Sequence, residues 1–70
     1  MGGRLTPRRI EILRCMARGL SYQAAGWQLG ISPNTVRNQM QKIFDALGLE
    51  GKRRRKILAI RLAREMGVMD

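Results

Sequence analysis

The side chains that could do chemistry gather between residues 34 and 42, where polar and cationic residues recur at helical spacing. They are Asn34, Thr35, Arg37, Asn38, Gln41 and Lys42. No acidic residue interrupts this set before Asp45, whereas a polar face that only meets solvent normally includes glutamates. Amide, hydroxyl and guanidinium groups in this pattern favour hydrogen bonding to a ligand rather than proton transfer.

The composition argues against catalytic and metal chemistry. The chain has one cysteine and no histidine, so it can form no intrachain disulfide and no Cys/His zinc site. It also has no imidazole for acid–base catalysis. We therefore predict that the protein is not an enzyme and that it carries no cofactor and no metal. Cys15 is expected to be a small, partly buried apolar residue.

The net charge indicates the kind of partner. In 70 residues, 14 Lys and Arg against 5 Asp and Glu give +9, with a pI near 11.6. A domain this basic binds polyanions through counterion release, so nucleic acid is the expected partner. An anionic membrane surface is the main rival, but no apolar run approaches the roughly 20 residues that span a bilayer. The few aromatic residues provide no stacking surface for single strands, which favours duplex DNA.

Residues 21–47 predict two helices joined by a tight turn. Ser21 and the pair Ser32-Pro33 are typical helix starts, because serine can accept a hydrogen bond from a free N–H and proline suits the first helical position. Gly30 can end the first of these helices in the left-handed conformation. Helices joined so closely must cross steeply, and Gly26 is small where their backbones come closest. This is the helix-turn-helix pattern of DNA-binding proteins.

The remaining residues add one helix on each side, which predicts an all-α fold: a compact four-helix domain with a central helix-turn-helix. The first helix starts at Thr6-Pro7, and the last one follows a block of five cations, KRRRK at residues 52–56, and runs to about Met66. We assign residues 1–4 to a flexible arm, 5–66 to the domain and 67–70 to a C-terminal tail.

A set of spaced residues gives the chain a specific family likeness. The segments are Leu5-Thr6-Pro7-Arg8, Glu11-Ile12-Leu13, Gly19-Leu20-Ser21, Leu29-Gly30-Ile31-Ser32, Thr35-Val36-Arg37-Asn38 and Leu47-Gly48-Leu49. Together they resemble the LuxR/GerE-type helix-turn-helix domain over about residues 5–66. The resemblance implies a bacterial, cytoplasmic, nucleoid-associated DNA-binding domain, either stand-alone or the effector of a response regulator. Such domains read DNA through the third helix, here about residues 33–47, and commonly dimerise through the fourth.

The resemblance also implies roles for individual residues. Arg37, Asn38 and Gln41 would contact bases, in agreement with the chemistry by which Arg pairs with guanine and Asn or Gln with adenine. The phosphate contacts would be Tyr22, Asn34, Thr35 and Lys42. From their charge, we expect further phosphate contacts from Lys52, Arg53, Arg54, Arg55 and Lys56. We expect a dimer or partner surface at Trp27, Ile57, Ile60, Arg61 and Arg64.

Several positions depart from the family pattern. Arg9 and Ala24 stand where the family favours Glu three residues after a cap, so both reciprocal capping boxes are absent. Ala25 replaces the usual Ile, and Gln39 replaces the usual His. Trp27 is costly to leave in water, so we expect it to fold over the domain edge or, as the alternative, to meet a partner.

Three interpretations remain at this point. The leading one is a sequence-specific regulator of transcription that binds duplex DNA as a homodimer. Region 4 of sigma factors also begins much like Leu5-Thr6-Pro7 and reads promoter DNA through a helix-turn-helix. A small adaptor would instead use Trp27 and the cationic block to bind an acidic partner, either another regulator or a subunit of RNA polymerase.

Overall fold

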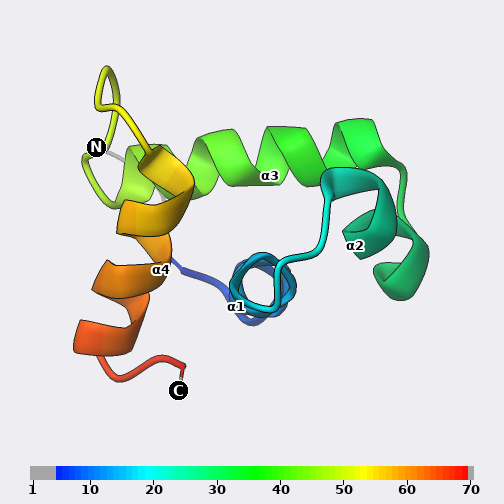
Figure 1. The fold of residues 1–70 in the computed structure, drawn as a ribbon, viewed down its shortest axis with the longest axis horizontal. Helices are drawn as coiled ribbons and strands as arrows, with labels where there is room; N and C mark the ends of the chain where they lie inside the picture. The colour runs from blue at the N-terminus through cyan, green and yellow to red at the C-terminus, as the bar shows by residue number, and fades with distance from the viewer. Residues whose placement is uncertain (1–4, 70) are drawn as a thin grey trace.

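The computed structural model describes residues 5–69, and these residues form four helices (Figure 1). Their bounds are α1 Pro7–Ala17, α2 Tyr22–Leu29, α3 Pro33–Ala46 and α4 Arg55–Glu65. Because no strand occurs among the described residues, the all-α prediction is confirmed. The arm predicted at residues 1–4 lies outside the described residues.

The first three helices begin where their capping residues predict. Thr6, Ser21 and Ser32 accept hydrogen bonds on their side-chain oxygens from the backbone N–H three residues later, at 3.3, 3.1 and 3.1 Å. Proline occupies the first turn of α1 and of α3. At the end of α2, Gly30 has φ 71° and ψ 31°, a left-handed conformation that glycine adopts without a Cβ penalty.

The fourth helix begins earlier than predicted. We expected it to follow the cationic block, but α4 starts at Arg55, so Arg55 and Lys56 lie in its first turn. Arg54 precedes the helix with φ 54° and ψ 41°, and no side chain caps the helix N-terminus. The cationic block contains no serine, threonine or proline that would indicate a helix start, and the left-handed turn at Arg54 supplies it instead.

Helices α1 and α3 form the centre of the core, and each of them packs against the other three helices. The largest fully buried side chains come from α1 and α3, and they are Ile12, Leu13, Val36, Met40 and Ile43. Helix α4 contributes Ala59 and Ala63, whose small side chains are also fully buried. Cys15 is buried with a free thiol, as expected. Met69 is buried as well, so the core extends into the segment predicted as a tail.

The arrangement leaves one side of α3 uncovered. In Figure 1, α3 lies across the top and α1 is seen end-on beneath it, while α2 and α4 lie near the two ends of α3. The loop between α3 and α4 projects past the C-terminal end of α3, on the side away from α1. The helix that the sequence predicts to read DNA is therefore supported from below and open above.

Candidate nucleic-acid interface

The open side of α3 carries the polar residues that the sequence singled out. The exposed residues are Asn34, Thr35, Arg37, Asn38, Gln41 and Lys42. On the opposite side of the same helix, Val36, Met40, Ile43 and Phe44 are buried in the core. Apolar packing thus fixes α3 in place and turns its amide and guanidinium groups to solvent. Helix α3 has a single acidic residue, Asp45, next to its last residue.

A notch at the N-terminal end of α3 is lined by residues of α2 and α3, and a cation of α4 lies beside it. Tyr22 at the start of α2 lines an open hollow together with Pro33, Asn34 and Arg37. The ammonium nitrogen of Lys56, in the first turn of α4, lies 5.0 Å from the centroid of the Tyr22 ring. A cation at this distance from an aromatic face is attracted by the ring quadrupole. The sequence predicted Tyr22 and Lys56 as separate phosphate contacts, and no spacing signal indicated that they touch.

The cationic block at residues 52–56 does not form one uniform surface. Lys52, Arg53 and Arg54 are exposed in the loop before α4. Arg55 is half-buried, and its guanidinium carbon lies 4.9 Å from the centroid of the Phe44 ring in the core. The Arg55 guanidinium is therefore partly engaged in packing within the domain, whereas the cations of loop 52–54 are exposed to solvent.

The turn between α2 and α3 depends on Gly26. A Cβ added at Gly26 would lie 2.5 Å from the carbonyl oxygen of Ile31 and 3.3 Å from the backbone nitrogen of Pro33. Both neighbours are backbone atoms and cannot rotate away as a side chain can. The backbone N–H of Ile31 also donates to the carbonyl oxygen of Gly26, at 2.9 Å. The prediction that a small residue is required at this close approach is confirmed.

Two of the departures from the family pattern contact each other. The Nε of Arg9 in α1 donates to the side-chain oxygen of Gln39 in α3, at 3.1 Å, in a partly buried position. This bond connects the N-terminal turn of α1 to the middle of the candidate recognition helix. Sequence reasoning treated the two residues separately, because they are thirty positions apart in the chain.

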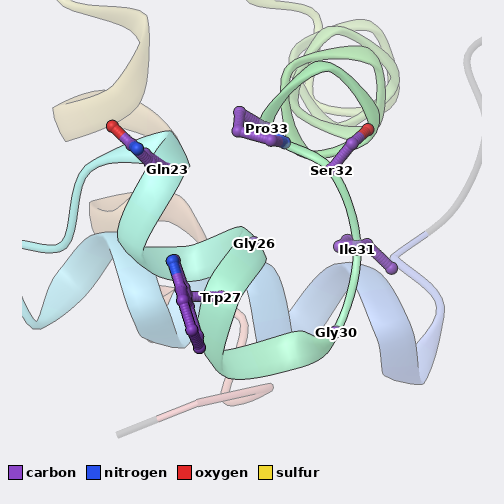
Figure 2. A pocket seen from close by; sticks show the side chains of 7 residues that line it. All are labelled: Gln23, Gly26, Trp27, Gly30, Ile31, Ser32 and Pro33. Carbon is purple, nitrogen blue, oxygen red and sulfur yellow. The ribbon is translucent and has the colours of Figure 1, made fainter.

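The expected dimer or partner surface separates into two regions. Ile57, Ile60, Arg61 and Arg64 line one hollow with Ala17 and Glu65, on α4 and the end of α1. Trp27 lies on α2, in a different hollow beside the helix-turn-helix turn (Figure 2). The expectation that Trp27 folds over the domain edge is wrong, because its side chain is 84% exposed. At helical spacing Trp27 points opposite to Ala25, and none of the residues 5–69 covers that side.

Residues 5–69 contain neither a candidate membrane span nor a candidate metal-binding cluster. In that part of the chain, no helix is both long and apolar enough to cross a membrane. The same residues bring together no group of three or more Cys, Asp or Glu side chains that could hold a metal ion.

A helix-turn-helix whose second helix is uncovered, polar and cationic is typical of DNA-binding domains of the helix-turn-helix class. Residues 3–59 of the chain match the family described as GerE, bacterial regulatory proteins, luxR family. This match covers most of the chain, and the protein therefore belongs to the luxR family of bacterial regulatory proteins, which are DNA-binding transcription regulators. Membership of this family favours the LuxR/GerE interpretation over the sigma-factor alternative.

A comparison with characterised proteins agrees with the family. The chain is similar to "Transcriptional regulatory protein YdfI" of Bacillus subtilis (strain 168), with 28% identity over 65 residues. The similarity covers 93% of this chain but 29% of YdfI, so the chain spans less than a third of that relative's length. No solved structure matches the chain.

Proposed function

We propose that this chain binds duplex DNA sequence-specifically and that α3 enters the major groove. The observation that carries the proposal is the open side of α3, where Arg37, Asn38 and Gln41 are exposed opposite a buried apolar side. With 14 residues, α3 is about 21 Å long, and the major groove admits a helix. Arg37 would pair with guanine and Asn38 or Gln41 with adenine, each good pair discriminating by about 1–3 kcal/mol.

Phosphate contacts would hold the helix in register on both sides of the groove. At the N-terminal end of α3, the notch supplies the Tyr22 hydroxyl and the Asn34 amide, and the Lys56 ammonium lies beside it over the Tyr22 ring. Thr35 and Lys42 would contact the same backbone along α3. The Thr35 hydroxyl already lies 2.9 Å from the capping hydroxyl of Ser32, which fixes its position. At the C-terminal end, the exposed cations of loop 52–54 would grip phosphates that flank the site.

A homodimer on DNA would form through α4. Ile57 is 60% exposed and Met66 is 56% exposed, which leaves apolar area on α4 for a second copy. Arg61 and Arg64 lie in the same region and bring like charges toward a two-fold axis. We therefore expect weak association in solution and tighter association on DNA, where phosphates offset the repulsion. Two-fold symmetry would separate the half-sites by about 34 Å, one turn of duplex DNA.

Selection of duplexes from a random pool tests the proposal, because it requires no knowledge of the operator. The chain should enrich duplexes that share a short site, with two copies one helical turn apart if it binds as a dimer. Guanine and adenine positions should be protected in the major groove of each copy. Enrichment without any shared site would refute sequence-specific reading.

Sedimentation at moderate salt tests the dimer separately. The free chain should be mostly monomeric, and it should become a two-to-one complex on the selected duplex. A tight dimer without DNA would contradict the expected repulsion at α4, and a one-to-one complex on a two-copy site would contradict dimeric binding.

A further inference from the structure

The hollow beside Trp27 has no use in the proposed contacts with DNA. Figure 2 shows Gln23 and Trp27 of α2 on one side and Ile31, Ser32 and Pro33 of the turn on the other, with Gly30 on the chain that joins them. Together with Gly26, these six residues line an open hollow of about 510 Å3. Trp27 is the largest exposed apolar side chain of the described residues, at 84% exposure. An exposed tryptophan beside a preformed hollow is a typical anchor point for a protein partner.

The lining of this hollow selects against DNA and against a second copy as its occupant. None of the seven lining residues is charged, whereas DNA is held mainly by cations that neutralise phosphates. A second copy of the chain would bring another +9 charge to the same place. Because like charge disfavours association, a protein segment of opposite sign fits this surface better than a second copy does.

A cation beside the Leu29-Gly30 end of the hollow adds a specific feature to that partner. At the Gly30 end of the hollow, the guanidinium of Arg8 donates to the carbonyl oxygen of Leu29 at 3.4 Å. Its ion pair with Glu11 is 3.9 Å long, and both side chains are about half exposed, so the pair is weak. The guanidinium can therefore donate to a second carboxylate. The cations Arg37 and Lys42, which are proposed to contact DNA, lie on α3 and are not needed to pair with the carboxylate of such a partner.

We infer that the Trp27 hollow docks an acidic protein segment, which inserts an apolar side chain against Trp27 and pairs a carboxylate with Arg8. The lining residues include none of the proposed base or phosphate contacts, although Pro33 also borders the notch beside Tyr22. We therefore expect the segment and duplex DNA to bind at the same time. The inference does not depend on α3 reading DNA, because it rests on a different surface.

Trp27 is the only tryptophan of the chain, so its fluorescence reports directly on the hollow. The probe is a short, labelled, end-blocked peptide with two aspartates on each side of a Leu-Leu centre. One control peptide has a Ser-Ser centre, and a second has lysines in place of the aspartates. Peptide affinity is measured by anisotropy of the label, and the position of the bound peptide is measured by the Trp27 emission and its quenching by acrylamide.

The Leu-Leu acidic peptide should shift the Trp27 emission to the blue, protect it from quenching and bind at least tenfold more tightly than either control peptide. Trp27→Ala should weaken that binding at least tenfold, and Arg8→Gln about threefold. The matched variant Gln28→Ala, an exposed neighbour on α2, should change it less than twofold. Circular dichroism should show that all three variants are folded.

Five results would overturn the inference. Equal binding of the Ser-Ser peptide, or an unchanged affinity for Trp27→Ala, would mean that charge alone holds the peptide elsewhere. Protection of Trp27 by a mixed-sequence duplex without peptide would assign the hollow to DNA. A loss of self-association in Trp27→Ala would assign it to a second copy. Absence of any binding by the Leu-Leu acidic peptide would also refute the proposed chemistry.

Discussion

The cations of residues 52–56 should have two different roles, DNA binding for those in the loop and stability for Arg55. Lys52 and Arg53 are exposed, and their side chains make no hydrogen bond or ion pair within the described residues. Arg55 instead lies against the Phe44 ring, at 4.9 Å from its centroid. We predict that the double variant Lys52→Gln/Arg53→Gln weakens DNA binding without changing stability, and that Arg55→Gln does the reverse.

The expected magnitudes follow from these contacts. Each phosphate contact contributes about −0.9 to the slope of log affinity against log salt concentration. Loss of two contacts flattens the slope by about 1.8, so the affinity lost between about 50 and 200 mM salt becomes about 12-fold smaller. Arg55→Gln removes a partly desolvated cation–π contact worth about 1 kcal/mol, which lowers the Tm of a domain of this size by about 4–8 °C.

Both effects can be measured without knowledge of the operator. Anisotropy of a labelled mixed-sequence duplex gives the salt slope, and thermal unfolding followed by circular dichroism gives the Tm. Arg18→Gln is the matched control, because it removes one exposed cation at the end of α1, outside the proposed interface. The reasoning is refuted if Arg55→Gln or Arg18→Gln flattens the slope by about 0.9, the change expected for the loss of one phosphate contact.

Three further experiments test how the interface is held. Gly26→Ala should lower the free energy of unfolding by about 1 kcal/mol, since overpacking of about 1–3 kcal/mol exceeds the gain in helix propensity of about 1 kcal/mol; denaturant unfolding that shows stabilisation would contradict the 2.5 Å approach to Ile31. Ala24→Glu should raise the free energy of unfolding by about 0.5–1 kcal/mol by completing the capping box with Ser21, and this gain should disappear when Ser21 is replaced by Ala. A double-mutant cycle of Arg9→Ala and Gln39→Ala should give a coupling of about 0.5–1.5 kcal/mol, and additive effects would show that their hydrogen bond contributes nothing.

The helix-turn-helix could be predicted because its determinants are local. Thr6, Ser21 and Ser32 cap helices through hydrogen bonds to residues three positions later, and such short-range bonds are visible in the sequence. Gly26 and Gly30 are required by the backbone geometry of the turn, and the helical spacing of the flanking residues is enough to locate that turn in the sequence. The buried and open sides of α3 follow in the same way from the periodicity of its apolar residues.

The remaining features depend on contacts between residues far apart in the chain. The start of α4 was not predicted because Arg54 takes a left-handed conformation that arginine rarely adopts. The contacts of Lys56 with Tyr22 and of Arg9 with Gln39 exist only after the helices pack. Trp27 was expected to be covered on the basis of its apolar surface, but α2 is only 8 residues long and buries its opposite side.

The central claim is that the open side of α3 distinguishes one DNA sequence from another. Its most direct test is the ratio of affinities for the selected site and for a scrambled duplex, measured for the natural chain, for Arg37→Ala and for the control Gln28→Ala. The account predicts that Arg37→Ala costs about 1–3 kcal/mol at the selected site, roughly 5- to 150-fold. For the scrambled duplex, Arg37→Ala should reduce the affinity by no more than the contribution of one phosphate contact. Gln28→Ala should change neither affinity. If Arg37→Ala leaves the ratio unchanged, α3 does not read bases through Arg37.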